Sequence, residues 1–413
     1  MKIDNNKNLF LYQYSKKDIN EAMKACELDL DASLSYIKEF EKKYSFFQKV
    51  KYVLACASGT SAMLEALWAC GVGEDTEVIV PAMTYWASAF QAFSLGAKVK
   101  YVDIEPNSLC IDPKQIENEI TKKTKAIVVV HLYGHPCDMD EIMQIAKKYD
   151  IYVIEDFSHA HGANYKGKLC GSIGDIGIAS CMREKAFPLV EGGVVCTNNE
   201  TLYERCCAFG HYRYLGCIEN GNSVKINKVK NANLLCFAGT SIGAIKNRMN
   251  PVSAALGSSI LDTFEDHILE LQKANNYFMD LLDSTDIYHG HRIIGEGNSM
   301  GGWYMPKLFV DEKYAKNISN YITSKGFNCY VGHKYFLLSD HFYNTYINAF
   351  TNTIELFGPK PLNHLNCDYS ISRYKNVVET DKRLISAPRF LRFDKFQIEK
   401  YAEIYINALN YIK

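Results

Sequence analysis

The middle of the chain alternates short, continuously apolar runs with segments of helical periodicity. The apolar runs, rich in β-branched residues, are Lys51–Ala57, Glu77–Pro81, Lys98–Ile104, Lys125–Leu132, Ile151–Ile154, Ile176–Cys181 and Gly193–Thr197. Helix-like stretches separate most of them, at Ser61–Ala69, Ala87–Phe93, Pro113–Ile120 and Met139–Tyr149. Runs such as KAIVVVHL are apolar throughout, as expected of strands covered on both faces. The pattern predicts an α/β domain with a mostly parallel, seven-stranded sheet.

The pattern changes after about residue 200. Residues 210–250 are rich in Gly, Asn and Lys with weak periodicity, which predicts loops near a site or an interface. Apolar positions at helical spacing from Pro251 to about Leu282 predict one long helix, and Gln397–Tyr411 predicts a closing one. We therefore predict two domains: residues 1–260, an N-terminal arm with the large sheet domain, and residues 261–413, a smaller α+β domain.

Composition and charge narrow the class of protein. The 413 residues are 47% hydrophobic and 23% charged, as in soluble globular proteins. Lys and Arg total 46 against 47 Asp and Glu, so there is no basic surplus for nucleic acid or an anionic membrane. The polar N-terminus does not suit a signal peptide, and no apolar run approaches about 18 residues. We expect a cytoplasmic protein with no nucleic-acid or membrane partner, whose 14 cysteines are free thiols.

Histidine and cysteine spacing does not match a zinc template. The chain has no CxxC pair. The nearest group is His131, His135, Cys137, His159 and His161, which lacks the spacing of known ligand sets. We expect no metal site.

The segment Ser58-Gly59-Thr60-Ser61 follows the first predicted strand and opens a helix. Free N–H groups at a helix N-terminus, together with hydroxyls, suit a phosphate. Ordinary N-capping by Thr60 or Ser61 is the alternative explanation.

Two further charged residues follow predicted strands. Asp156 ends an apolar run, where α/β sheets place ligands, and could hold a protonated nitrogen or a metal; a helix cap or a surface acid is the alternative. Lys185 lies five residues after Ser180, just past the sixth strand. A lysine is commonly a solvated surface charge, but one that is desolvated near a cationic group has a lowered pKa and becomes nucleophilic.

In chain order, these residues meet the needs of one cofactor. Pyridoxal 5′-phosphate (PLP) needs its phosphate neutralised, its ring stacked, its pyridine nitrogen kept protonated and its aldehyde held by a lysine. The phosphate-binding segment, the aromatic Tyr85, the strand-end Asp156, and then Ser180 and Lys185 supply these in order.

The sequence resembles the DegT/DnrJ/EryC1/StrS sugar aminotransferases, which have the fold type I (aspartate aminotransferase-like) architecture. The resemblance runs from about Tyr52 to Leu261 and is carried by GTSAMLEAL, VIVPAMTYWAS, VIEDFSHAHGA, the Ser180-to-Lys185 spacing, EGGVVCT and RMNPVSAALG. The C-terminal third resembles the family only in its general pattern of polar and apolar residues and carries none of these motifs.

The resemblance implies a role for each matching residue. Lys185 would form the Schiff base with the cofactor and later move the proton. Asp156 would pair with the pyridinium, His159 would lie beside the ring oxygen, and Tyr85 would stack on the ring. The phosphate would bind at Gly59, Thr60, Ser61 and Ser180.

Two positions depart from the family pattern. Val190 stands where the family often has Gly before Glu-Gly-Gly. Lys246 stands where a neighbouring subunit usually gives an Asn to the phosphate, and a lysine could serve there as a point charge. We therefore count Lys246 as a cofactor-binding residue and expect a homodimer with shared active sites. Some relatives that are sugar dehydratases have His in place of the lysine, and Lys185 argues against that activity.

The resemblance implies an aminotransferase that takes nitrogen from an amino acid, L-glutamate by preference. The acceptor would be a keto-sugar, nucleotide-linked, for polysaccharide or secondary-metabolite biosynthesis. A cyclitol, a sugar phosphate or a keto-sugar acid is the alternative acceptor, and a non-catalytic binding or regulatory protein is the alternative class. Residues 210–250, with His211, Tyr212 and Arg213, and residues 328–345 are expected to shape the choice of acceptor.

Overall fold

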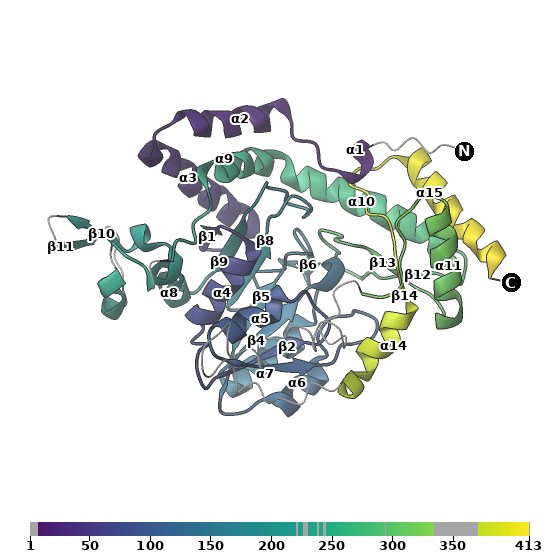
Figure 1. The fold of residues 1–413 in the computed structure, drawn as a ribbon, viewed down its shortest axis with the longest axis horizontal. Helices are drawn as coiled ribbons and strands as arrows, with labels where there is room; N and C mark the ends of the chain where they lie inside the picture. The colour runs from purple at the N-terminus through teal and green to yellow at the C-terminus, as the bar shows by residue number, and fades with distance from the viewer. Residues whose placement is uncertain are drawn as a thin grey trace, which may run out of the picture.

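A seven-stranded sheet forms the centre of the protein (Figure 1). The computed structural model describes residues 7–219, 222–225, 230–237, 239–242, 245–293, 295–333 and 371–412. The strands are β1 (Tyr52–Cys56), β2 (Glu77–Pro81), β3 (Lys98–Val102), β4 (Thr124–Val130), β5 (Tyr152–Asp156), β8 (Ile176–Ser180) and β9 (Gly193–Thr197). Their order in the sheet is β1-β9-β8-β5-β4-β2-β3. Each overlaps one of the seven predicted runs, with β4 starting one residue earlier and β5 ending two residues later, so the predicted α/β class and sheet are confirmed.

Strand direction decides where the polar strand ends meet. Strands β3, β2, β4, β5 and β8 pair in parallel, whereas β9 is antiparallel to both of its neighbours, β8 and β1. Strand β1 therefore runs in the same direction as β8. Six of the seven strands consequently end at one edge of the sheet, where α/β proteins place their ligands. The positions of β2 and β9 are buried throughout, since helices cover both faces.

The four helices predicted between these strands are present. They are α4 (Gly59–Ala69), α5 (Ala87–Ser94), α6 (Pro113–Glu119) and α7 (Met139–Tyr149). Helix α6 begins with a proline after the N-cap Asp112, and α7 has acidic residues in its first turn and basic residues in its last, which complements the helix dipole. Among the described residues, none of the helices combines the length and apolar character needed to cross a membrane.

The N-terminal residues form helices that the sequence pattern did not predict. They are α1 (Lys7–Phe10), α2 (Lys16–Glu27) and α3 (Leu30–Gln48). Helix α2 starts with a reciprocal capping box between Ser15 and Asp18. Helices α2 and α3 lie beside α9 (Pro251–Ile260), at the top of Figure 1.

The predicted single helix from Pro251 to Leu282 is interrupted. Helix α9 ends at Ile260, a 3-10 turn spans Leu261–Thr263, and α10 runs over Phe264–Asp283. Thr263 has φ −130° and ψ 9°, outside the helical region, and Asp262 in the turn binds Lys17 (2.6 Å) and Lys43 (3.0 Å) of the N-terminal helices. Apolar spacing continues through the turn, so it gave no sign of the interruption.

The C-terminal part combines a small antiparallel sheet with helices, as predicted. Its strands are β12 (His289–Gly290), β13 (Lys307–Phe309) and β14 (Leu384–Ser386), and its helices include α11 (Glu312–Ser324), α14 (Lys375–Arg383) and α15 (Lys395–Ala408). The domain boundary at residue 260 stays a prediction. Helix α8 (Glu200–Gly210) precedes the segment predicted as loops, residues 210–250. Within that segment, β10 (Gly216–Glu219) and β11 (Asn222–Lys225) form a hairpin, which projects from the body in Figure 1.

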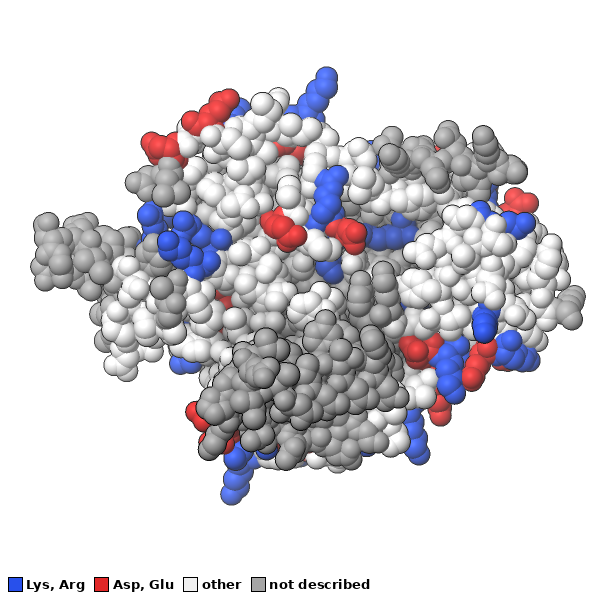
Figure 2. All heavy atoms as spheres, in the orientation of Figure 1, with Lys and Arg blue, Asp and Glu red and all other residues white. Residues whose placement is uncertain are grey.

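The surface agrees with a chain of near-zero net charge. On the face shown in Figure 2, acidic and basic side chains of the described residues are interspersed. The described cysteines are free thiols, and most are buried, as Cys70, Cys181 and Cys196 are. This agrees with the prediction that the cysteines are not paired.

The packing of α10 against α15 gives a prediction about stability. Phe278 is fully buried, with its ring 5.2 Å from that of Phe390 and 5.4 Å from that of Tyr405. Phe278→Ala should lower the free energy of unfolding by about 3–5 kcal/mol, because it leaves a cavity. Urea unfolding of the apoprotein measures this. Phe396→Ala is the matched control, since Phe396 is 61% exposed and should change stability by less than about 0.5 kcal/mol; equal losses would contradict the core assignment.

Candidate active site

The shared edge of the sheet holds a cavity of about 570 Å³, a size typical of small-molecule sites. Seven of the nine predicted site residues line it: Gly59, Thr60, Tyr85, Asp156, His159, Ser180 and Lys185. Ser61 and Lys246 are outside its lining. Val190, which departs from the family pattern, also lines it and is 61% exposed.

One end of the cavity is made by the N-terminus of α4 against the end of β8. A Cβ atom on Gly59 would lie 2.6 Å from Cβ of Ser180, so no other residue fits there without a shift. Backbone N–H groups in the first turn of a helix have no partner within the helix, and those of Gly59 and Thr60 belong to that turn. Together with the Ser180 hydroxyl they form a site suited to a phosphate.

Ser61 has a capping role instead of a direct place in the cavity. The N-cap residue is Ser58, whose Oγ accepts from the Ser61 backbone N–H (3.1 Å), while Ser61 Oγ accepts from the Ser58 N–H (3.0 Å). The N-cap is therefore Ser58, which precedes the alternative N-caps Thr60 and Ser61 that the sequence suggested. The reciprocal bonds fix the first turn that the phosphate would meet.

Asp156 is held by hydrogen bonds from two serines. Its Oδ2 accepts from the Ser88 hydroxyl (2.7 Å) and its Oδ1 accepts from the backbone N–H of Ser158 (3.0 Å). The Ser158 hydroxyl in turn accepts from the backbone N–H of Ser180 (2.8 Å). The carboxylate and the phosphate-binding strand end are therefore fixed relative to each other.

Lys185 is half-buried and lines the same cavity. Desolvation lowers its pKa to about 7; Asp156 opposes this, and the guanidinium of Arg389 adds to it. Its Nζ lies 3.6 Å from the centre of the Tyr304 ring. An amine with this pKa is substantially unprotonated at neutral pH, as a nucleophile and proton carrier must be.

His159 is a neutral histidine beside the lysine. Burial and the charge of Lys185 hold its pKa well below the usual range. Its Nδ1 accepts from the backbone N–H of Tyr133 (3.3 Å), so Nε2 carries the proton and can donate. Its ring is 4.4 Å from that of Tyr304.

Lys246 lies outside this cavity and is exposed. The next residue, Asn247, is buried and points inward, and its side-chain amide donates to the Ser61 carbonyl (3.2 Å). Lys246 is therefore next to a residue that contacts α4, but its own side chain faces solvent in the single chain. Its role toward a cofactor stays a prediction.

The sequence did not identify several residues that lie around the cavity. Ser88 and Ser158 lie in quoted motifs but had no assigned role, whereas Tyr304 and Arg389 gave no signal. Arg389 donates to the Glu184 carbonyl (2.6 Å), and burial lowers the pKa of its guanidinium to about 10. Tyr304 and Arg389 come from the C-terminal third, where the family pattern is weak.

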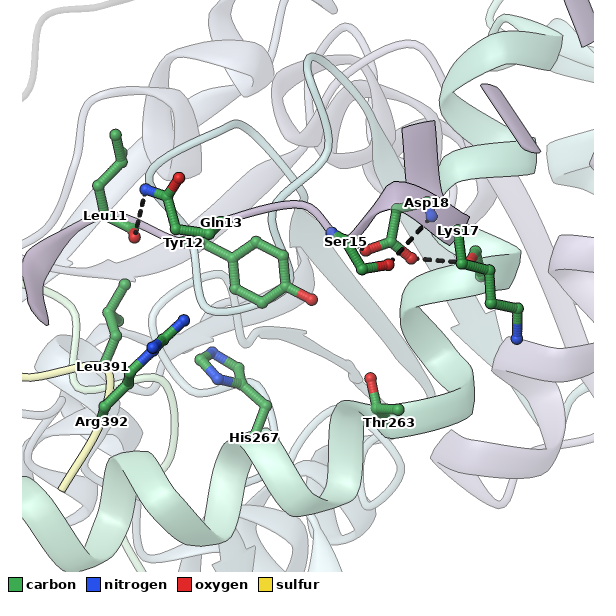
Figure 3. A pocket seen from close by; sticks show the side chains of 11 residues that line it. Leu11, Tyr12, Gln13, Ser15, Lys17, Asp18, Thr263, His267, Leu391 and Arg392 are labelled. Carbon is green, nitrogen blue, oxygen red and sulfur yellow. Dashed lines mark hydrogen bonds between the residues drawn. The ribbon is translucent and has the colours of Figure 1, made fainter. Parts of the chain in front are cut away.

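A second cavity, of about 290 Å³, lies between the N-terminal arm and α10 (Figure 3). The rings of Tyr12 and His267 meet there at 5.1 Å, and burial lowers the pKa of His267 to about 4. Lys17, at its rim, is paired with Asp262. It has no residue with the chemistry of Lys185, so the first cavity is the candidate active site.

The fold and the site define a fold type I PLP enzyme. A cavity combining a phosphate-binding helix end, a carboxylate and a lysine of lowered pKa fits this cofactor: Gly59 lets the helix end approach Ser180 closely, and Asp156 and Lys185 face the same space.

The comparisons agree with this class. The model of the DegT/DnrJ/EryC1/StrS aminotransferase family matches residues 13–354, so the chain belongs to this family of PLP-dependent aminotransferases. A GDP-perosamine synthase of Escherichia coli O157:H7 is 32% identical over 287 residues, 68% of this chain and 73% of that protein. An L-glutamine:2-deoxy-scyllo-inosose aminotransferase of Streptoalloteichus tenebrarius is 39% identical over 168 residues, 41% of this chain and 40% of that protein.

A solved structure supports the fold. The putative sugar aminotransferase of Streptococcus pneumoniae, in its PMP form, has a TM-score of 0.77 at 21% identity and covers 98% of this chain and 99% of its own. Similarity at this identity shows the fold alone. Together with the family match, it confirms the predicted fold type and the cofactor.

The contact at Gly59 generates a prediction. Gly59→Ala should raise the dissociation constant for PLP at least about tenfold, because the new methyl group separates α4 from Ser180. Equilibrium titration of the apoprotein with PLP measures it. Gly73→Ala is the control, since the nearest atom to its Cβ would be 3.9 Å away. Unchanged affinity in Gly59→Ala would place the phosphate elsewhere.

The lowered pKa of Lys185 predicts how PLP uptake depends on pH. Only the unprotonated amine attacks the aldehyde, so the association rate should rise with pH and level off above about pH 7, instead of rising towards 10.5. Arg389→Gln removes a cationic neighbour and should move the midpoint to higher pH; Arg392→Gln, at the second cavity, should not. Stopped-flow absorbance records the rates. A wild-type rate still rising at about pH 9 would contradict the desolvation of Lys185.

Proposed function

We propose that the chain transfers an amino group from L-glutamate to a keto-sugar, nucleotide-linked, as part of polysaccharide or secondary-metabolite biosynthesis. The observation that carries the transamination is Lys185, whose pKa is lowered, facing Asp156 across one cavity. The sugar acceptor is supported by the perosamine synthase relative, whose match spans two thirds of this chain. The dimer with shared sites and the cytoplasmic location remain part of the proposal, on the family resemblance.

When bound, PLP supplies an electron sink for the carbon that carries the amino group. Lys185 would hold the cofactor through its aldehyde, and its free amine would carry the proton between the donor's α-carbon and the cofactor carbon on the other side of the shared nitrogen. Its pKa of about 7 suits both directions of this transfer near neutral pH.

The surrounding residues orient the cofactor. Asp156, fixed by Ser88 and Ser158, holds a proton on the pyridine nitrogen by charge attraction. His159 donates from Nε2 to the ring oxygen, and Tyr85 packs against the ring. Gly59, Thr60 and Ser180 hold the phosphate, Ser61 fixes the helix end that they share, and Lys246 serves the phosphate of a second subunit.

A cyclitol acceptor is the second candidate. It is favoured by the inosose aminotransferase relative, although that match spans 40% of the relative's length. The residues expected to choose the acceptor are only partly described: His211 is buried, and residues 334–345 lie outside the described part of the chain.

The visible spectrum of the holoenzyme tests the proposal. L-glutamate should bleach the band of lysine-bound PLP, and a GDP- or dTDP-linked keto-sugar added afterwards should restore it within the same turnover. Lys185→Ala should lack the band, whereas Lys147→Ala, on the exposed face of α7, should keep it. Restoration by 2-deoxy-scyllo-inosose alone would favour the cyclitol acceptor. A band that ignores every amino acid would overturn the transaminase assignment.

A further inference from the structure

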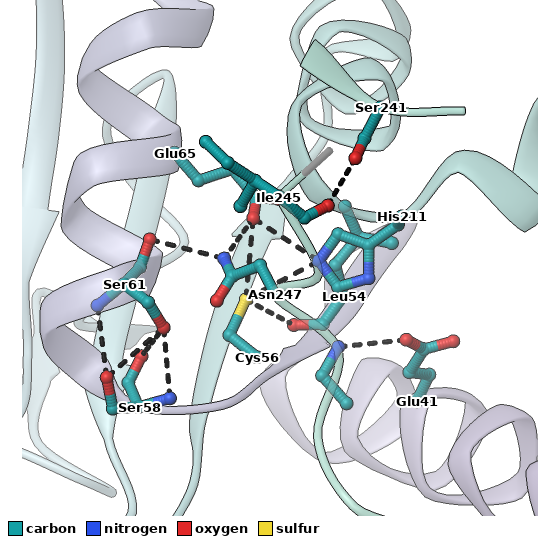
Figure 4. Close-up of polar contacts among 11 residues, drawn as sticks. Glu41, Leu54, Cys56, Ser58, Ser61, Glu65, His211, Ser241, Ile245 and Asn247 are labelled. Atoms are coloured by element: carbon teal, nitrogen blue, oxygen red, sulfur yellow. Dashed lines mark hydrogen bonds and ion pairs between the residues drawn. The ribbon is translucent and has the colours of Figure 1, made fainter. Parts of the chain in front are cut away.

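Three buried side chains of ligand type meet behind the N-terminal half of α4 (Figure 4). They are Cys56 at the end of β1, Glu65 on α4 and His211 after α8. Glu65 and His211 are buried polar residues, and Cys56 is fully buried. This group is separate from the cavity that holds Lys185.

The distances among the three ligand atoms match a tetrahedral metal centre. Glu65 Oε2 lies 3.3 Å from His211 Nε2 and 3.9 Å from Cys56 Sγ, and Cys56 Sγ lies 3.8 Å from His211 Nε2. A tetrahedral zinc ion with bonds of about 2.0–2.3 Å separates its ligand atoms by roughly 3.3–3.8 Å. One ion can therefore contact all three atoms with little movement.

Polar atoms without partners gather around the same point. Glu65 Oε1, His211 Nδ1 and Asn247 Oδ1 are buried and make no hydrogen bond within the described residues. Buried polar atoms are normally satisfied, and a local group of exceptions indicates a bound ion or water. An ion pair between His211 and Glu65 would explain their 3.3 Å contact, but it would leave Glu65 Oε1 unsatisfied, whereas an ion can take this oxygen as a further ligand.

The nearby carboxylate of Glu41 differs from that of Glu65 in its hydrogen bonds. Glu41, labelled in Figure 4, accepts from the backbone N–H of Ala55 (2.8 Å) through Oε1 and from the Tyr214 hydroxyl (2.7 Å) through Oε2. Both of its oxygens have partners, so it is not a ligand. The amide of Asn247 donates to Glu65 Oε2 and to the Ser61 carbonyl, which orients the Glu65 carboxylate as outer partners orient metal ligands.

We propose that Cys56, Glu65 and His211 bind a structural zinc ion, with Glu65 Oε1 or a water in the fourth position. A thiolate, an imidazole and a carboxylate together suit zinc, whereas calcium and magnesium take oxygen ligands alone. The site joins β1, α4 and the segment after α8. Cys56 lies 9 residues from Glu65 and 155 from His211, so spacing templates do not detect it.

Metal analysis of the holoenzyme, purified without chelator and with its tag removed, tests the proposal. About one zinc per chain is expected by mass spectrometry, and X-ray absorption at the zinc edge should show one sulfur at about 2.3 Å. Less than about 0.1 zinc per chain after dialysis against zinc, or zinc without a sulfur ligand, would overturn the proposal. These measurements use the wild-type protein and do not depend on how variants fold.

Substitutions locate the ion. Cys56→Ser, Glu65→Gln and His211→Gln should each lose most of the zinc, whereas Cys70→Ser, a buried cysteine outside the group, should keep it. Zinc retained by all three variants would show an adventitious ion only and would overturn the assignment. The proposal does not rest on the transaminase reaction, because metal content is measured without substrate.

Discussion

The structure of the active site depends on the close approach of two backbone segments, the N-terminus of α4 and the end of β8. They come this close only because residue 59 has no side chain: a Cβ there would meet Cβ of Ser180 at 2.6 Å. The approach follows from the sheet, since β9 runs antiparallel to both of its neighbours and so turns β1 to the direction of β8. Without that reversal, the helix after β1 would begin at the opposite edge, away from Asp156 and Lys185.

The second constraint is the burial of positive charge. Lys185 and Arg389 are both desolvated, and Arg389 disfavours the charged form of Lys185, whereas Asp156 favours a charged lysine. Desolvation is the larger effect at Lys185, and a pKa of about 7 leaves a substantial fraction of its amine neutral near pH 7. The same burial and the same cations keep His159 neutral, so it can donate to an oxygen while it accepts from the Tyr133 backbone.

Sequence alone predicted the sheet and most of the site, for a physical reason. Strands covered on both faces are apolar throughout, and the polar residues that follow them must gather where parallel strands end, as Asp156, Ser180 and Lys185 do. Contacts between segments far apart in the chain had no such signal. The Ser88 hydroxyl reaches Asp156 across 68 residues, and Tyr304 reaches Lys185 from the C-terminal third. The interruption at Leu261–Thr263 was hidden because apolar spacing continues through it.

The segment that carries Lys246 is fixed against the end of β1 and against α4. Its backbone pairs with the end of β1, through the Ala57 N–H to the Asn247 carbonyl (2.7 Å) and the Met249 N–H to the Ala55 carbonyl (2.7 Å). Neighbouring side chains in an extended segment point to opposite sides, so the inward direction of Asn247 requires Lys246 to point outward. Lys246 is exposed and outside the lining of the Lys185 cavity, so in the single chain it does not contact that cavity. A contact between Lys246 and a cofactor phosphate therefore requires the second subunit of the proposed dimer, and it stays a prediction.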